Sequence, residues 1–523
     1  MKRIIALMLC LCLCLFLVLF AGCGEDEDPH VPTGDALVME GQDPESVYGK
    51  PEEDPQDITL VYYPDRSLNP LESTDFTNRA LFSLIYQGLF SVDANWNPTP
   101  ILCKQYYISA DSRSYTIYIE NATFSDGTPL TINDVLATYE AARKSDYYKG
   151  RFTHIKDISL SGDGGITFTL DTPFENLPLL LDIPILKANQ LEAEIPLGSG
   201  PYALESSIAG AHLRKVLNWW GKQSIVVTAD SIPLVKAESP SQIRDEFVFN
   251  DLSLVCANPC ADAYADYRCD YGLWDCDNGV FLYLGCNVTY SDVFSDERVR
   301  SALTYAIDRE ALAENIYRGF ALPATLPASP RSPYYSASLA DRYTYDPMRF
   351  IDALNAYGII GEPVSLLVNS DDSMRVRTAR AIKEMLEECG LPVELNEQPT
   401  YGFIRALGNG DYDLYLGQTK LSANMDLSSF YGPWAPMSLG GLSNANIYSL
   451  CLSALANRGN YYDLHKAAAD DGRVTSILFS GYAIYATRGL VTDLTPSRDN
   501  VFYYSLGKNM EDARIPTVYD NPG

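Results

Sequence analysis

The sequence lacks the short motifs by which most hydrolases and nucleotide-binding enzymes are recognised. It contains no Gly-x-Ser-x-Gly elbow, no His-Glu-x-x-His pair and no Walker phosphate loop. Histidine is scarce, and none of the four residues, His30, His154, His212 and His465, has a nucleophile in a recognisable family context. Acids are abundant, as in glycosidases, but no catalytic pair stands out. These absences argue against an enzyme.

Basic residues are also few. Lys and Arg number 39 against 68 Asp and Glu, which gives a formal net charge of −29 at pH 7. No run of Lys or Arg is present that would displace counterions from phosphates. Nucleic acid is therefore not expected as a partner, and the acidic surface favours solubility.

The cysteines do not have the spacing of a metal site. The cluster Cys256, Cys260, Cys269 and Cys276 has gaps of three, eight and six residues and no neighbouring histidine, whereas zinc modules usually use two matched pairs with short gaps. In an exported chain, local disulfides or buried thiols are expected instead, and the sequence does not determine the pairing. We expect no metal and no cofactor.

The first 23 residues are typical of a secretory signal peptide. Lys2 and Arg3 precede an apolar run over 4–20, and Ala21-Gly22-Cys23 ends it. This ending resembles the lipobox of bacterial lipoproteins, which implies cleavage after Gly22 and lipidation of Cys23. The mature chain would then be anchored to the extracytoplasmic face of the cell membrane. An uncleaved membrane-spanning anchor is the alternative, because the run approaches the length that crosses a bilayer.

Residues 23–56 are rich in Asp, Glu, Pro and Gly and have no apolar periodicity. They are expected to form a disordered acidic tether. The remaining chain is longer than one hydrophobic core usually supports, so two or three lobes are expected, built from discontinuous segments.

Strand and helix patterns alternate along this body. Periodicity predicts a helix over 76–88. A second helix is predicted to begin after Thr131, with the Asp134 side chain reaching back to the Thr131 backbone amide as in a capping box. A β-α-β unit is predicted from a strand over 364–368, a helix over 372–388 and a strand over 392–396, with a further strand at 413–418. The fold class is therefore α/β.

Several blocks together resemble one family. They are Ser67-Leu-Asn-Pro-Leu71, Tyr86-Gln-Gly-Leu-Phe90, the run from Ala122 to Val135, Gly198-Ser-Gly-Pro-Tyr202 and the run from Arg298 to Arg309. In their order and rough spacing they resemble the bacterial extracytoplasmic solute-binding proteins of family 5, the oligopeptide-, dipeptide- and nickel-binding components of ABC importers. The resemblance extends over residues 57 to about 506.

The resemblance implies a periplasmic-binding-protein-like fold with two α/β lobes and a hinge of two crossover strands, near 284–287 and 484–488. Lobe I would comprise 57–75, 190–284 and 485–523, with an extra α+β subdomain at 76–189, and lobe II would comprise 285–484. The function implied is capture of a small solute in the cleft and its delivery to an ABC permease with its ATPase subunits, that is, transmembrane transport. A monomer is expected.

Peptide-like ligands lead by resemblance, but one expected residue is missing. Peptide-binding members carry an acid, in a loop after the Asp-Tyr-Asp-Leu strand, that pairs with the peptide's α-ammonium. The matching position here is Ala423, and Leu427 replaces the usual proline. An α-ammonium buried without a counter-charge would lose several kcal/mol. Asp426 is either a substitute from a shifted loop or the N-cap of a helix over 427–431.

Other cleft candidates follow from position and not from a motif: Tyr62, Tyr63, Trp274, Asn287, Gln418, Tyr431 and Trp434. Aromatic walls with a few amides suit amphipathic ligands, from peptide side chains to sugars. Ordinary packing is the alternative role for each of them. Nickel or haem uptake is less favoured, because no His/Met cluster can be assigned to the cleft.

Two other functional classes stay open. One is an exported carbohydrate-active hydrolase that works through two carboxylates. The other is a non-transporting sensory or adhesive lipoprotein. A ligand retained unmodified supports import or sensing, whereas a cleaved product supports catalysis.

Overall fold

The structure is a computed structural model that describes residues 37–38, 58–93, 95–207, 210–249, 251–260, 269, 271–487, 490–492, 494–498, 501–504 and 506–508. All of them belong to the unit that begins at Pro32. The predicted signal peptide, the lipidation site Cys23 and most of the predicted tether lie outside the described residues. Within the tether, Leu37–Val38 forms a short strand, β1, that pairs with Leu273 and Gly272. Among the helices of the described ranges, none combines the length and the apolar character that a membrane span requires.

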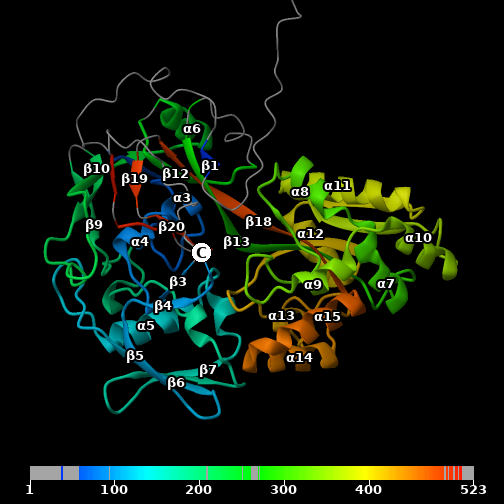
Figure 1. The fold of residues 1–523 in the computed structure, drawn as a ribbon, viewed down its shortest axis with the longest axis horizontal. Helices are drawn as coiled ribbons and strands as arrows, with labels where there is room; N and C mark the ends of the chain where they lie inside the picture. Colours follow the sequence, from blue (N-terminus) through cyan, green and yellow to red (C-terminus); the bar gives the residue numbers. More distant parts are fainter. Residues whose placement is uncertain are drawn as a thin grey trace, which may run out of the picture. The chain divides into compact units, whose positions relative to one another are not determined.

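A large mixed sheet runs through the centre of this unit (Figure 1). Its strands lie in the order β12 (Leu254–Ala257), β18 (Val474–Thr487), β13 (Tyr271–Cys286), β17 (Leu414–Lys420), β15 (Val364–Asn369) and β16 (Val393–Gln398), and β14 (Leu322–Pro323) adds to β18. The predicted β-α-β unit is confirmed, since β15 and β16 pair in parallel and α11 (Ser373–Glu388) connects them.

Two long strands, β13 and β18, connect separate hydrophobic cores. At one end of the antiparallel pair, Trp274 and Ile484 pack into a first core formed mainly by residues 58–234. At the other end, Leu284 and Ile477 pack into a second core formed mainly by residues 282–416. The ladder is irregular between these ends, with a shift of register between Asp277 and Val280. The strands therefore pass from the first core to the second near 277–281 and 479–482.

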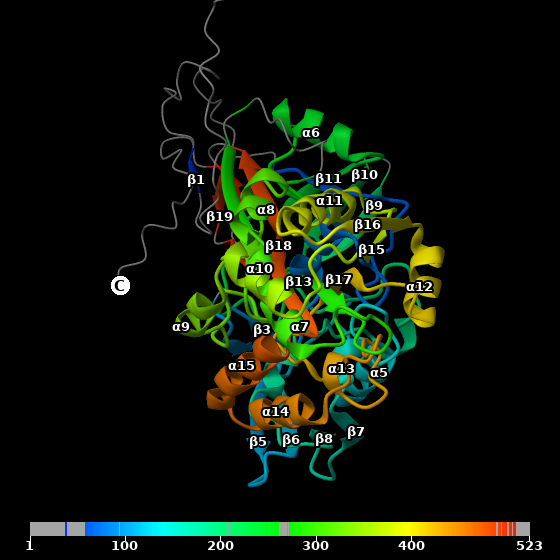
Figure 2. The ribbon, with the colours of Figure 1, turned by 90° about the vertical axis from the view of Figure 1, so that its right-hand side faces the viewer.

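Two smaller sheets build the first core (Figure 2). In one, β2 (Leu60–Tyr62) lies parallel to β11 (Ser231–Lys236), followed by β10 (Gly210–Lys215) and β9 (Tyr202–Ser207). The other is antiparallel, in the order β5 (Cys103–Ile108), β6 (Ser114–Ile119), β8 (Ile166–Leu170), β7 (Ile155–Leu160), and is called the β5–β8 sheet below. Its helix α5 (Ile132–Ala142) begins as predicted, because the Asp134 carboxylate accepts from the Thr131 amide at 2.8 Å.

The remaining helices of the described ranges are α3 (Phe76–Arg79), α4 (Phe82–Ile85), α6 (Pro240–Val248), α7 (Glu297–Leu303), α8 (Arg309–Asn315), α9 (Ala337–Ala340), α10 (Pro347–Ala356), α12 (Thr400–Asn409), α13 (Ser428–Tyr431), α14 (Ala445–Ala456) and α15 (Tyr461–Asp471). Short 3-10 turns lie at 149–152, 177–180, 188–190, 304–306, 341–343 and 458–460. Two-stranded pairs are β3 (Phe90–Val92) with β4 (Pro98–Pro100), β19 (Leu490–Thr492) with β22 (Leu506–Lys508), and β20 (Thr495–Pro496) with β21 (Val501–Phe502).

The single helix predicted over 76–88 is wrong. The chain forms two short helices, α3 and α4, because it tightens at Leu81, whose amide bonds to Asn78, and leaves the helical conformation at Tyr86. The Asn78 side chain also bonds to the backbone of Tyr63 and Arg66. These local bonds outweigh the apolar periodicity.

The eight cysteines in the described ranges are free thiols. Seven are buried, and Cys269 is half-buried. Local disulfides and buried thiols were the two alternatives for the cluster from Cys256 to Cys276. The structure shows free thiols, three of them buried and Cys269 half-buried. Among the described residues, no group of three His, Cys, Asp or Glu side chains is arranged to hold a metal ion.

Candidate ligand-binding site

The segment 421–427, between β17 and α13, is held rigidly beside the point where β13 and β18 change core. The Leu421 amide donates to the carbonyl of Gly279 at 2.9 Å, and the Arg498 guanidinium donates to the Leu421 carbonyl. Met425 is fully buried in a left-handed conformation with φ 52°. Ala423, at the position of the missing acid, is also buried. This segment therefore places a buried methyl group at the position where the family resemblance predicts an acid.

Ala423 belongs to a third core that joins different parts of the chain. It contains Val92, Trp96 and Leu179 from the first half of the chain, together with side chains of β13, α13, α14 and α15. The Arg498 guanidinium lies 5.4 Å from the ring centre of Trp96. The predicted subdomain 76–189 thus packs directly against the segment that follows β17.

Asp426 is fully engaged inside the protein. Its carboxylate accepts from the Ser428 amide at 2.9 Å and the Ser428 hydroxyl at 2.7 Å, and it lies 3.3 Å from Nε2 of His154. Burial alone raises the pKa of the Asp426 carboxyl, but the bonds from His154 and Ser428 outweigh it and hold the pKa below its usual range. Of the two roles predicted for Asp426, the capping one agrees with these contacts.

The side chain of Lys420, the last residue of β17, packs against a cluster of aromatic rings that also contacts Arg79. The Lys420 ammonium donates to the hydroxyl of Tyr147 at 3.0 Å and lies 4.9 Å from its ring centre and 5.9 Å from that of Phe76. Arg79 lies over the same Tyr147 ring at 3.7 Å and donates to the Tyr148 hydroxyl at 2.7 Å. Sequence reasoning missed these residues, because no motif marks them and Lys420 lies 273 positions from Tyr147.

The other predicted residues do not gather at one place. Tyr62 and Tyr63, around the end of β2, are buried in different cores, and Trp274 is buried in β13. Gln418 is exposed on β17, opposite Leu282. Trp434 is completely exposed in a left-handed conformation.

Asn287 and Tyr431 are both buried. The Asn287 amide donates to the carbonyls of Gly410 and Tyr412 at 3.0 and 2.8 Å, and its oxygen accepts from two backbone amides, so its hydrogen bonds are used within the fold. The Tyr431 hydroxyl has no hydrogen-bond partner among the described residues, and burial raises its pKa well above the usual range. Of the predicted residues, Tyr62 and Trp274 share the first core, whereas Tyr431 lies in the third core at the end of α13.

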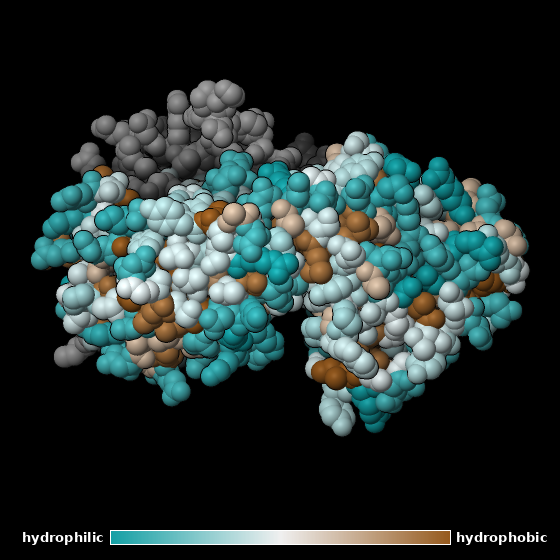
Figure 3. Space-filling view, turned by 90° about the horizontal axis from the view of Figure 1, so that it is seen from below, coloured by the Kyte–Doolittle hydropathy of each residue, from teal (hydrophilic) through white to brown (hydrophobic). Residues whose placement is uncertain are grey.

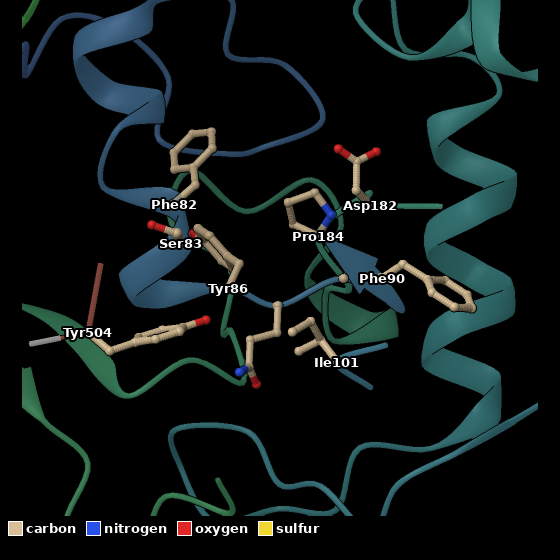
Figure 4. A pocket seen from close by; sticks show the side chains of 10 residues that line it. Phe82, Ser83, Tyr86, Phe90, Ile101, Asp182, Pro184 and Tyr504 are labelled. Atoms are coloured by element: carbon tan, nitrogen blue, oxygen red, sulfur yellow. The ribbon is translucent and has the colours of Figure 1, made fainter. Parts of the chain in front are cut away.

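A separate small pocket lies in the first core (Figure 4). Its lining includes Phe82, Tyr86, Gln87, Asp182 and Tyr504. The Gln87 side-chain oxygen accepts from the Trp220 indole at 2.8 Å, and Asp182 pairs with Arg151. Because these polar groups are already bonded within the protein, the pocket offers little to orient a ligand.

The side of the surface drawn in Figure 3 is mostly hydrophilic and is interrupted by a recess.

Comparison with known proteins defines the class. The structure resembles AppA, a putative peptide-binding protein of Clostridium difficile, with a TM-score of 0.71 at 17% identity over 87% of this chain and 100% of that one. It also resembles NikA of Brucella suis, solved with Fe(III)-EDTA, with a TM-score of 0.70 at 16% identity over 87% and 100%. MppA, a periplasmic murein tripeptide-binding protein in its unliganded open form, gives 0.71 at 15% identity over 91% and 99%. The predicted periplasmic-binding-protein-like α/β class is confirmed.

The family follows from the sequence match. Residues 97–438 match the model of bacterial extracellular solute-binding proteins, family 5. The glutathione-binding protein GsiB of Salmonella typhi is 24% identical over 356 residues, which is 63% of this chain and 67% of that protein. This chain belongs to the family 5 bacterial extracellular solute-binding proteins. It is therefore a solute-binding protein of the ABC-importer type and not an enzyme, which sets aside the hydrolase alternative.

Proposed function

We propose that this chain captures a small peptide-like solute between two lobes and delivers it to an ABC permease. The family membership supports capture, and the peptide-binding and glutathione-binding relatives support the ligand class. The observation that carries the proposal is the pair β13 and β18, which joins two hydrophobic cores through an irregular stretch. A sheet interrupted there can bend more easily than a regular ladder, as lobe closure requires.

The domain division and location are part of the same proposal. Lobe I would be 57–75, 190–284 and 485–523 with a subdomain at 76–189, and lobe II would be 285–484. Cleavage before Cys23 and lipidation of that residue would hold the protein at the extracytoplasmic face of the membrane as a monomer. The apolar run before Ala21-Gly22-Cys23 supports this location.

We further propose that the ligand is not held by its α-ammonium at position 423. Ala423 offers no charge, and Asp426 is already bonded to His154 and Ser428. The cation at the end of β17, Lys420, lies three positions before Ala423. Recognition of peptide backbone and side chains, or of a carboxylate, agrees better with this arrangement than recognition of a free amine.

The test is calorimetric titration of the protein with glutathione, with a tripeptide and with the N-acetylated form of that tripeptide. We expect at least one of these ligands to bind, and we expect acetylation to change Kd by less than about tenfold, or about 1.4 kcal/mol. Failure of all three to bind contradicts the peptide-like class. Loss of binding on acetylation alone contradicts the proposed recognition mode but leaves the class intact.

A further inference from the structure

His154 lies between two acids that belong to different parts of the chain. It is buried and directly precedes β7. Its Nδ1 is 3.1 Å from the carboxylate of Asp171, which follows β8, and its Nε2 is 3.1 Å from the hydroxyl of Ser428 and 3.3 Å from the carboxylate of Asp426. These four residues are called the His154 cluster. Figures 1 and 2 show the β5–β8 sheet beside α14 in both views.

Both ring nitrogens of His154 face acceptors. Asp171 and Asp426 are carboxylates, and the Ser428 hydroxyl donates its own proton to Asp426 at 2.7 Å, so it presents lone pairs to Nε2. A neutral imidazole has one N–H donor, whereas an imidazolium has two. When both nitrogens are protonated, His154 donates toward the Asp171 and Asp426 carboxylates at the same time. In the neutral state, one of these charge-assisted bonds is lost, and Nε2 would accept a hydrogen bond only if the Ser428 hydroxyl turned away from Asp426.

The other titratable groups around the cluster do not supply a competing positive charge. Tyr448 and Cys451 of α14 and Tyr461 of α15 are within electrostatic range of Asp426. Burial raises the pKa of each of these three groups, so they stay neutral at ordinary pH. Among the described residues, the ion pairs of Asp171 and Asp426 are both with His154.

The serine, histidine and aspartate of this cluster are not arranged as a catalytic triad. The Ser428 hydroxyl donates to the Asp426 carboxylate at 2.7 Å, and Ser428 is buried at the start of α13. A nucleophile in that state is neither activated by the imidazole nor reachable by a substrate. The cluster is better suited to hold two parts of the fold together.

We propose that the His154 cluster is a proton-dependent contact that closes the β5–β8 sheet onto α13 when His154 is charged and loosens when His154 loses its proton. Two further hydrogen bonds join the segment that follows β8 to α14 and the turn after it. The Arg458 amide donates to the Glu175 carboxylate at 3.2 Å, and the Glu175 amide donates to the carbonyl of Leu455 at 3.0 Å. His154 is thus the component that makes the interface sensitive to pH.

The direction of the pKa shift agrees with this role. Burial alone lowers the pKa of His154, but the hydrogen bond and charge of Asp426, and then those of Asp171, outweigh it and raise the pKa above 6.5. A group whose pKa is raised in the closed state stabilises that state fully below about 6.5, and this contribution disappears as the pH rises through the raised value. The contact is expected to be strong in a mildly acidic exterior and weak in an alkaline one.

The contact itself does not depend on a ligand, whereas an effect on capture rests on the proposed function. If closure of this interface accompanies capture, ligand affinity should rise as the pH falls, since both favour the same state. A protein that shows the pH-dependent contact but binds no peptide-like solute would refute the proposed function alone.

The first test is an NMR titration of the imidazole nitrogens in the ligand-free protein, whose sequence holds only four histidines. His154→Gln assigns the signal, and His212→Gln is the control, since His212 lies 27% exposed on a different sheet. We expect His154 to remain doubly protonated above pH 6.5 and to lose this property in Asp426→Asn. A titration at or below 6.5 in the wild-type protein would overturn the proposal.

The second test compares amide exchange of the wild-type protein and His154→Gln at the same pH, which cancels the intrinsic pH dependence of exchange. At pH 5.5 the variant should exchange faster in segments 150–160 and 421–431, by up to tenfold for each unit by which the pKa is raised. At pH 8.5 the two proteins should agree. A ratio that does not change with pH would overturn the proposal, and Asp171→Asn provides a second variant if His154→Gln does not fold.

Discussion

Gly481 faces the carbonyl group of Cys276 so closely that no side chain fits between the two strands. A Cβ at position 481 would lie 2.8 Å from the Cys276 oxygen and 2.9 Å from the oxygen of Phe320. Gly481 pairs with Asp277, where the β13–β18 ladder becomes irregular and the two strands pass from the first core to the second. The absence of a side chain therefore allows close backbone packing at the junction on which the proposed lobe closure depends.

Replacement of Gly481 by alanine should destabilise the protein by about 1–3 kcal/mol, because backbone atoms must shift to admit the methyl group. Urea unfolding measures this change. Gly408→Ala is the matched control, since Gly408 lies in α12 with no atom within 4 Å of an added Cβ. It should be neutral or stabilising by up to about 1 kcal/mol. Equal effects of the two substitutions would contradict the account of the junction.

His465 should lower the stability of the protein at acidic pH. It is fully buried in α15, neither ring nitrogen has a hydrogen-bond partner among the described residues, and burial lowers its pKa to about 3. Above pH 6.5 the imidazole is neutral in both the folded and the unfolded state, so its protonation does not affect stability. As the pH falls from 6.5 towards 3, the unfolded state binds a proton that the folded state does not, and the free energy of unfolding decreases.

His465→Leu tests this effect. Removal of the unsatisfied polar atoms should raise the free energy of unfolding by about 1–3 kcal/mol near neutral pH and should flatten its decline below pH 6.5. Chemical unfolding at several pH values measures both changes, with His212→Leu as the control. An unchanged acid slope in His465→Leu would show that the imidazole is hydrogen-bonded in solution.

The contact between Lys420 and Tyr147 should contribute modestly to holding β17 against the first half of the chain. Lys420→Met keeps most of the side-chain volume and removes the charge over the ring, so we expect a loss of about 0.5–2 kcal/mol. Tyr147→Phe removes the hydroxyl that accepts from Lys420 and keeps the ring, and should cost about 0.5–1.5 kcal/mol. A double-mutant cycle by urea unfolding measures the coupling, and full additivity would contradict it.

Position 423 should determine whether a free amine is recognised. Ala423→Asp introduces a carboxylate into a buried, largely apolar environment and should destabilise the ligand-free protein. It should also make binding of the tripeptide stronger than binding of its N-acetylated form. Ala423→Asn is the control of equal size without charge. Calorimetric titration measures the preference, and an amine preference in Ala423→Asn as well would show that charge is not the cause.

Much of the fold could be predicted from the sequence because it depends on local patterns. The β-α-β unit follows from a β-branched run, an amphipathic helix and a glycine stop, and Asp134 caps its helix three residues from Thr131. The helix over 76–88 is predicted wrongly because the chain tightens at Leu81 and leaves the helical conformation at Tyr86, and apolar periodicity carries no information about such turns.

The site was less predictable because its contacts join distant parts of the chain. Asp426 was expected either to substitute for the missing acid or to cap a helix over 427–431; the helix begins at Ser428 with Leu427 as its N-cap, and Asp426 accepts from the Ser428 amide one position earlier, which is a local relationship. Its second partner, His154, lies in another sheet, and only the fold brings the two together. The same holds for Lys420 and Tyr147. By contrast, the missing acid at Ala423 was visible in the sequence, because the family motif provided the position at which to look.

The central claim is that this protein encloses a peptide-like solute and releases it unchanged. Native mass spectrometry of the protein after incubation with mixed pools of peptides, sugars and metal ions tests it most directly. We predict an adduct whose added mass equals that of an unmodified peptide-pool member. A sugar or metal adduct alone, the appearance of cleaved products, or no adduct from any pool would contradict it.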